Sequence, residues 1–238
     1  MNSPSALSRP SHVHLVVVAL LVGLLVATVS LVRGDGDPAA LVKFGEERTA
    51  RTEHAESEMG RDVVTFSDLG HDGQFFFIQA LDPLHVDPEV HASLLDRPIY
   101  RAQRMLYPLI AGVGGAVPAG WLPWSMLATN LAALALGTLG TARLAELNGA
   151  NRWWGLAFTL NIGMVFEVDI SGAGVLAFAA AIWGVVMLEQ DRAREATAWF
   201  LVAVLAREVM LLFLGGVIVL RWLRTRRIPW MLGAIPAG

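Results

Sequence analysis

Leu15 to Val32 is a run of 18 consecutive uncharged residues near the N-terminus, most of them Leu or Val. As a helix rising about 1.5 Å per residue, this run would be roughly 27 Å long, enough to cross the hydrocarbon core of a bilayer. A secretory signal peptide is the alternative, because Arg9 precedes the run. The run is longer than a usual signal core, however, and no small-residue cleavage site follows before Arg33. We therefore expect an uncleaved first transmembrane helix over 15–32.

The charged residues are distributed unevenly around this run. Hydrophobic residues make up 55% of the chain and charged residues 16%, a composition too apolar for an ordinary soluble domain. Of the 21 acidic residues, 14 lie between Arg33 and Arg104. This distribution predicts an all-α, polytopic membrane protein with a long outer loop. The expected divisions are a cytoplasmic N-terminus (1–14), the first span (15–32), an extracytoplasmic loop (33–121) and a helix bundle (122–238).

Composition also excludes several classes of function. A net charge of −3 argues against nucleic acid as a partner, because nucleic-acid binding usually needs a basic face. The absence of cysteine excludes disulfides, thiolate catalysis and zinc sites built on Cys. The histidines of the loop show no His-x-x-x-His spacing of the kind that ligates a metal.

The outer loop contains three segments of different character. The charged stretch Glu46 to Arg61 fits either a solvated helix or a mobile loop. Gly73 to Leu81 predicts a short aromatic-rich helix that stops before Pro83 and lies at a membrane interface. Met105 to Val117 is too short to cross a bilayer comfortably, so we expect an interfacial or re-entrant helix there.

Four longer apolar segments follow the loop, and a fifth begins at the end of the chain. The expected spans are Leu122 to Leu144, Trp153 to Phe166, Ile170 to Leu188 and Ala196 to Leu220, and Ile228 to Gly238 looks like the start of another. Arg207 and Glu208 interrupt the fourth segment. Folding it there into two short helices places nine arginines on the cytoplasmic side, among them Arg143, Arg152 and Arg192. Glu167, Asp169, Arg207 and Glu208 then all lie on the outer side.

Three segments of the chain resemble a known family. Gly70 to Ala80 (GHDGQFFFIQA), Leu95 to Pro108 (LDRPIYRAQRMLYP) and Leu205 to Leu212 (LAREVMLL) are similar to motifs of GT-C superfamily membrane glycosyltransferases, particularly those of bacterial cell-surface glycopolymer formation. His71 stands where that family usually has an aromatic residue, and Val209 where it has Thr. The family has more spans than this chain, so the resemblance implies an N-terminal portion of a longer enzyme.

The resemblance implies an activity and its partners. Such enzymes move a sugar from a polyprenyl-phosphate donor to a hydroxyl group of a glycan, lipid or protein acceptor, at the outer face of the cell membrane. The acceptor hydroxyl needs a general base, and the lipid-phosphate leaving group needs cationic donors or a metal. No cofactor is required by the motifs, although the chemistry leaves room for a divalent cation at Asp72.

The same resemblance assigns candidate site residues, and each has a structural alternative. Asp72 is the expected catalytic base, with capping of a helix that starts at Gly73 as its alternative. Arg101 and Arg104 are expected to contact the phosphate, because they share a helical face, and their alternative is snorkelling toward lipid headgroups. The remaining candidate substrate-binding residues are Gln74, Tyr107, Asp169, Arg207 and Glu208. Gln74 and Tyr107 could instead be ordinary interface residues, and Asp169 could simply be exposed at the outer surface. Arg207 and Glu208 could instead form a structural ion pair at the turn.

Two other functions fit parts of the sequence. A non-catalytic subunit that only binds a lipid-linked glycan, or a flippase-like one, would need the same pocket without turnover. A transporter would use Arg207 and Glu208 as an intramembrane charge site, but no inverted repeat is apparent and the polar residues gather on one side.

Overall fold

The computed structural model describes residues 10–46, 50–66, 69–84, 86 and 88–225. These residues form helices joined by short turns, with one isolated parallel bridge between Phe44 and Thr65. The expectation of an all-helical chain is therefore confirmed for this part of the sequence. The segment Ile228 to Gly238, expected to begin another span, lies outside the described residues.

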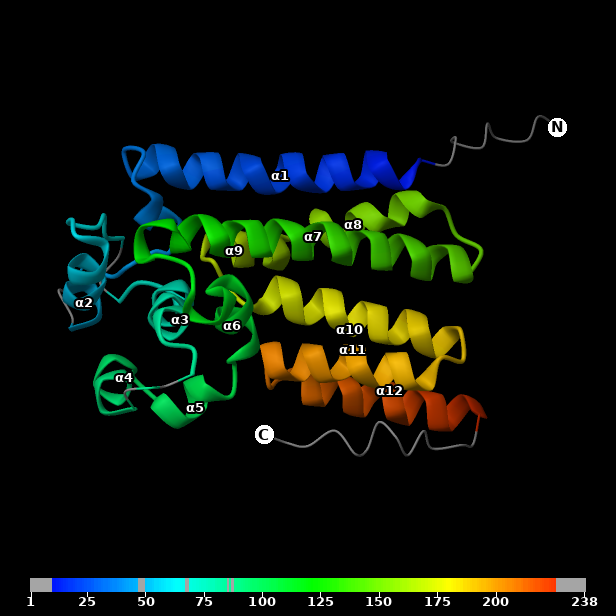
Figure 1. Ribbon diagram of the computed structural model, residues 1–238. Coiled ribbons are helices and arrows are strands. Elements are labelled where there is room, and N and C mark those ends of the chain that lie inside the picture. The colour runs from blue at the N-terminus through cyan, green and yellow to red at the C-terminus, as the bar shows by residue number, and fades with distance from the viewer. Residues whose placement is uncertain (1–9, 47–49, 67–68, 85, 87, 226–238) are drawn as a thin grey trace.

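Five long helices lie side by side in a layered bundle (Figure 1). They are α1 (His12–Arg33), α7 (Leu122–Leu147), α10 (Gly174–Glu189), α11 (Ala193–Ala206) and α12 (Met210–Thr225). Small residues let the helices approach closely, since a Cβ at Gly184 would lie 2.7 Å from Phe200 on α11. The break between α11 and α12 falls at Arg207 to Val209, so the predicted fold of this segment into two helices is confirmed.

The polar segment after α1 folds into a compact group of short helices at one end of the bundle (Figure 1). Its helices are η1 (Pro38–Leu41), α2 (Ala50–Met59), α3 (Asp72–Leu81), α4 (Pro88–Leu94), α5 (Pro98–Ala102) and α6 (Leu106–Ala111), followed by η2 (Val113–Gly115) and η3 (Ala119–Trp121). The turn between α11 and α12 and the turn before α10 reach the same end. Residues far apart in the sequence therefore meet there.

The short aromatic helix is confirmed, but its expected environment differs. Phe75, Phe76, Phe77 and Ile78 on α3 are all buried among other protein side chains. Phe76 packs edge-on against Tyr107 of α6, and Phe77 packs edge-on against Phe44. The aromatic residues thus form the core of the end group of helices, because burying their large apolar area against protein stabilises the fold.

Two of the expected spans differ from the prediction, one in its continuity and the other in where it begins. The segment 153–166 is not one helix but is divided among η4 (Arg152–Gly155), α8 (Leu156–Thr159) and α9 (Ile162–Asp169). Asn161 causes the second break, because its side chain accepts a hydrogen bond from the Gly163 N–H and starts α9. The helix expected from Ile170 begins only at Gly174, after a turn in which Ser171 has a φ of 50°.

Two of the helical segments, α1 and Ala119–Leu147, are long and apolar enough to cross a membrane. The core helix of a soluble protein or a signal sequence would pass the same test. Large apolar side chains are nevertheless exposed along α1, including Val13, Leu21, Leu25 and Val32. A second exposed apolar surface follows α12, at Leu212, Val219, Leu220 and Leu223.

Candidate functional site

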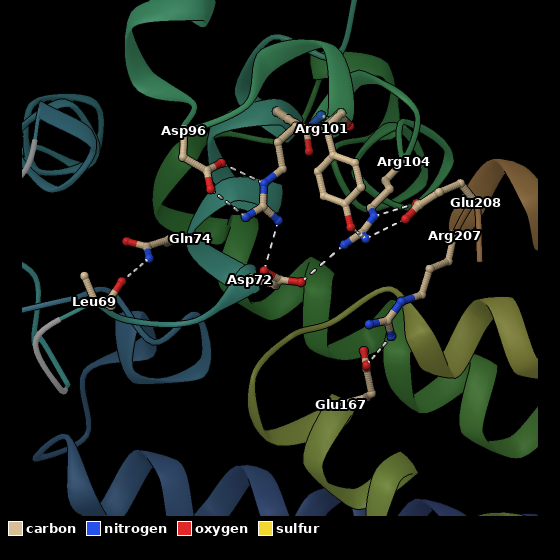
Figure 2. Close-up of polar contacts among 11 residues, drawn as sticks. Leu69, Asp72, Gln74, Asp96, Arg101, Arg104, Glu167, Arg207 and Glu208 are labelled. Carbon is tan, nitrogen blue, oxygen red and sulfur yellow. Dashed lines mark hydrogen bonds and ion pairs between the residues drawn. The ribbon is translucent and has the colours of Figure 1, made fainter. Parts of the chain in front are cut away.

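Asp72 lies at the start of α3, facing two arginines of the segment around α5 (Figure 2). Its Oδ1 accepts a hydrogen bond from Arg101 Nη1 at 2.9 Å, and its Oδ2 accepts one from Arg104 Nη1 at 3.4 Å. Arg101 is only 6% exposed and Arg104 only 5%. The structure therefore brings together the three residues that the sequence selects for chemistry, and it buries both guanidinium groups instead of extending them toward lipid headgroups.

Asp72 does not cap α3. The N-cap residue is His71, which makes no capping hydrogen bond through its side chain, and Asp72 is the first residue of the helix. The Asp72 carboxylate turns away from the helix axis toward the arginines (Figure 2). The capping alternative is wrong for this reason, although a carboxylate in the first turn still interacts favourably with the helix dipole.

Arg101 is held on two sides by carboxylates. Its Nε and Nη2 donate to the two oxygens of Asp96 at 3.0 and 3.3 Å, while Nη1 reaches Asp72. Burial alone would lower the pKa of Arg101, but these hydrogen bonds outweigh it and raise the pKa. For Asp96 burial would raise the pKa, and the bonds from Arg101 bring it below its usual range. Arg101 thus remains charged, and it also stacks on Phe75 with 3.8 Å between the guanidinium carbon and the ring centre.

Arg104 connects the end group of helices to the turn between α11 and α12. Its Nε and Nη2 donate to the two Glu208 oxygens, each at 2.7 Å, in a bidentate pair. Arg104 also bonds the Tyr100 hydroxyl. The interruption of the apolar segment at Glu208 is therefore explained by a partner that lies 104 positions earlier in the chain.

Arg207 pairs with Glu167 at the end of α9 (Figure 2). The second Glu167 oxygen accepts a hydrogen bond from the Gly174 N–H, the first residue of α10, at 2.8 Å. Gly172 and Gly174 make room for this carboxylate, since a Cβ on either residue would overlap it. The alternative of an ion pair between Arg207 and Glu208 is therefore wrong: Arg207 pairs with Glu167 and Glu208 with Arg104, on two different elements of the fold.

A polar cavity of about 470 Å³ opens beside Asp72. Its charged and polar lining comes from α2, α3, the loops before α3 and α5, and the ends of α9 and α11, and consists of Arg51, His71, Asp72, Asp96, Glu167 and Arg207. The cavity is large enough for a monosaccharide and part of an acceptor. Asp72 and Arg207 are the predicted site residues that border it.

Gln74 and Tyr107 lie elsewhere. Gln74 is buried, and its Nε2 donates to the Leu69 carbonyl oxygen at 2.7 Å, which fixes the loop before α3. The Tyr107 hydroxyl is buried between α6 and α7, where it accepts a hydrogen bond from Asn130 Nδ2 at 3.1 Å. Both residues support the fold around the cavity without lining it.

Asp169 borders a different, largely apolar groove. It accepts a hydrogen bond from Ser30 Oγ at 2.5 Å and lies 3.4 Å from the Nζ of the buried Lys43. The groove is about 750 Å³ in volume and runs between α1 and α9, with Phe166 lining both it and the polar cavity. Asp169 therefore fastens α9 to the C-terminal end of α1, whereas Glu167, two residues earlier, faces the cavity.

Sequence reasoning missed three residues of this site. Arg51 lies in the segment 46–61, where charge suggests only a solvated face, and Asp96 resembles any loop carboxylate. Glu167 stands out as an acidic residue among apolar ones, but nothing local distinguishes it from Asp169. The one available signal is the pair of glycines at 172 and 174, which is interpretable only once the carboxylate is known to fill their space.

Metal ligation has little support in the described residues. Within them, no three His, Asp or Glu side chains are grouped in a way that could hold a metal ion. Both Asp72 oxygens accept hydrogen bonds from arginines. A cation at Asp72 would therefore have to displace guanidinium groups.

Gly73, next to Asp72, sets how closely α3 approaches its neighbours. A Cβ at this position would overlap the backbone oxygens of Val42 and Ile170, which cannot move aside as a flexible side chain could. We expect Gly73→Ala to destabilise the protein by about 1–3 kcal/mol and to displace Asp72. Denaturant unfolding of the purified protein measures the effect. Gly120→Ala is the matched control, since nothing lies within 4 Å of its added methyl group, and an equal effect of the two changes would contradict the packing argument.

Comparison with known proteins gave no match to a protein-family model, to a curated protein or to a solved structure.

Proposed function

We propose that this chain is a GT-C-like glycosyltransferase that moves a sugar from a polyprenyl-phosphate donor to a hydroxyl acceptor. The observation that carries the proposal is the convergence of Asp72 with Arg101, Arg104 and Glu208 beside a polar cavity. These residues come from the three segments that resemble the family, and they are separated by up to 136 positions (208 minus 72) in the sequence. Arg207 of the same turn borders the cavity.

We further propose that the protein is a multi-pass protein of the cell membrane with the cavity at its outer face. The exposed apolar side chains of α1 and α12 support this, because soluble proteins rarely expose such continuous apolar surfaces. The residues that line the cavity belong to α2, α3, the end of α9 and the neighbouring turns, and Figure 1 shows these elements at one end of the bundle. The turns between α7 and η4 and between α10 and α11, next to Arg152 and Arg192, lie at the opposite end. Basic residues at the end away from the cavity fit a cytoplasmic location.

In the proposed reaction, Asp72 accepts the proton of the acceptor hydroxyl as its oxygen bonds to the anomeric carbon. The bond from that carbon to the phosphate oxygen breaks, and the polyprenyl phosphate leaves with the electron pair. General-base help of this kind accelerates a reaction by about 10²–10⁴-fold. A single displacement would invert the anomeric configuration, as in inverting hydrolases.

The apolar groove between α1 and α9 suits the isoprenoid chain of the donor. Its lining is mostly aliphatic or aromatic, including Leu25, Val29 and Phe166, and its charged members are Arg33 and Asp169. Because Phe166 also lines the polar cavity, a lipid in the groove would have its phosphate near Asp72 and Arg207. This adjacency of an apolar channel and a charged cavity matches an amphiphilic substrate better than a soluble nucleotide sugar.

A transfer assay tests the proposal. The full chain, reconstituted in nanodiscs, is incubated with a panel of radiolabelled polyprenyl-phosphate monosaccharides and an acceptor extract. Radiolabel in the acceptor fraction is expected for one donor, with inverted linkage. If the lipid donor binds but no donor is ever consumed, the protein is instead a non-catalytic subunit for lipid-linked glycans. The engagement of both Asp72 oxygens by arginines favours that alternative.

A further inference from the structure

The guanidinium groups that border the polar cavity are those of Arg51 and Arg207. Arg101 and Arg104 contact Asp72 but are not part of the lining. An anion entering the cavity therefore meets Arg51 and Arg207 before it can reach the other pair. The two groups come from different parts of the chain, since Arg51 is in the first turn of α2 and Arg207 follows α11.

Arg51 differs from the other arginines in its bonding. Its Nη1 donates to the Leu94 carbonyl oxygen at 3.3 Å, and its guanidinium carbon lies 4.5 Å from the centre of the Phe75 ring. Its Nε is buried and has no hydrogen-bond partner. Within the described ranges, no carboxylate forms an ion pair with Arg51, whereas Arg101, Arg104 and Arg207 are each paired with at least one.

A buried donor without a partner is costly, so its presence needs an explanation. Burial lowers the pKa of Arg51; the charge of Asp96 partly offsets this, and the charge of Arg101 adds to it. A bound anion in the cavity would supply the counter-charge that Arg51 lacks. Phosphate is the anion that a guanidinium group matches best, because its oxygens accept two parallel hydrogen bonds.

The already paired arginines are poorer candidates for this task. A phosphate at Arg101 would have to displace Asp96 or Asp72, and one at Arg104 would have to displace Glu208 or Asp72. Arg207 is held by Glu167, whose carboxylate is fixed in turn by the Gly174 N–H. Binding at Arg51 displaces none of these carboxylates.

We propose that Arg51 is the anion-binding residue of the cavity and takes the phosphate group of the lipid-linked substrate. This assignment rests on the proposed function, and it gives the residues of the site separate roles. Arg51 holds the phosphate, Arg101 and Arg104 position Asp72, and Asp72 faces the reacting hydroxyl. The negative charge that develops on the leaving phosphate would then be stabilised by a guanidinium group that has no competing carboxylate.

Binding measurements on the full chain in detergent test the assignment. The probes are inorganic phosphate, farnesyl phosphate as a short lipid phosphate, and farnesol as its uncharged counterpart. Arg51→Gln should weaken both phosphate probes about tenfold or more and leave farnesol binding unchanged. Arg51→Lys should retain most of the affinity, because it keeps the charge. Arg61→Gln is the matched control, since Arg61 follows the other end of α2, pairs with Asp37 and lies outside the cavity lining.

The outcomes separate this inference from the proposed function. Loss of phosphate affinity in Arg51→Gln, with a melting temperature like that of Arg61→Gln, supports the assignment even if no sugar is transferred by the wild-type chain. If Arg51→Gln loses affinity for only one of the two phosphates, the probe affected shows whether the site binds a lipid headgroup or a free anion. Unchanged affinity for both phosphates in Arg51→Gln, or no phosphate binding by the wild type, overturns the assignment, whether or not the transfer activity exists.

Discussion

Asp72→Asn is expected to lower the rate of sugar transfer by about 10²–10⁴-fold, the usual contribution of a general base. The asparagine side chain has nearly the same shape as aspartate but cannot accept a proton from the acceptor hydroxyl. The rate is measured in nanodiscs under single-turnover conditions, with the amount of inserted protein quantified in parallel. Donor binding should persist, because the change leaves the groove and Arg51 in place.

The control for this prediction is Asp62→Asn, which removes an exposed carboxylate from the same end of the molecule. It should transfer sugar at the wild-type rate. The Asp72→Asn variant also removes a charge that lies between Arg101 and Arg104, so its unfolding is compared with that of the wild type. Transfer at the wild-type rate by Asp72→Asn would show that another group, or none, acts as the base.

Arg104→Gln is expected to destabilise the folded protein by about 3 kcal/mol. Removing one partner of a buried ion pair leaves the other charge without compensation, which typically costs about 3–5 kcal/mol. Here Glu208 and Asp72 lose a donor together, and their partial exposure places the effect at the lower end. Denaturant unfolding followed by tryptophan fluorescence measures the change in the free energy of unfolding.

A double variant tests whether the lost stability comes from the Glu208 carboxylate that is left without its partner. Arg104→Leu combined with Glu208→Leu removes both charges of the pair and should recover part of the lost stability. Arg143→Gln breaks an exposed pair with Glu146 near the end of α7 and should cost less than about 1 kcal/mol. If Arg104→Gln costs no more than Arg143→Gln, Arg104 does not hold the turn between α11 and α12 in place.

The helices could be predicted well where a single local rule decides them. The uncharged run at 15–32 leaves few alternatives to a helix, and α1 extends it by only a few residues at each end. Pro83 ends α3 because proline lacks an N–H and restricts the preceding residue. The segment 153–166 was harder, since its continuous apolar character hides the capping by Asn161 that divides it.

The candidate site was predictable only in part. The resemblance selects Asp72, Arg101, Arg104, Arg207 and Glu208, and the structure brings these residues to one end of the bundle. The resemblance does not predict which of these residues form ion pairs. Arg207 and Glu208 are adjacent and of opposite charge, so the sequence suggests that they pair with each other. Their partners, Glu167 and Arg104, are 40 and 104 positions away.

The helical character of the chain, its acidic segment and the charged residues that interrupt apolar stretches can all be recognised from the order of the amino acids alone. These properties follow from local composition and periodicity, which each short stretch carries alone. The packing of the helices sets which charges neutralise one another, which carboxylate faces the cavity and which arginine keeps a donor without a partner. Those outcomes depend on the distances between segments remote in the chain. Electrostatic pairing and burial act through space, so they can be determined only from the structure in which the helices have packed.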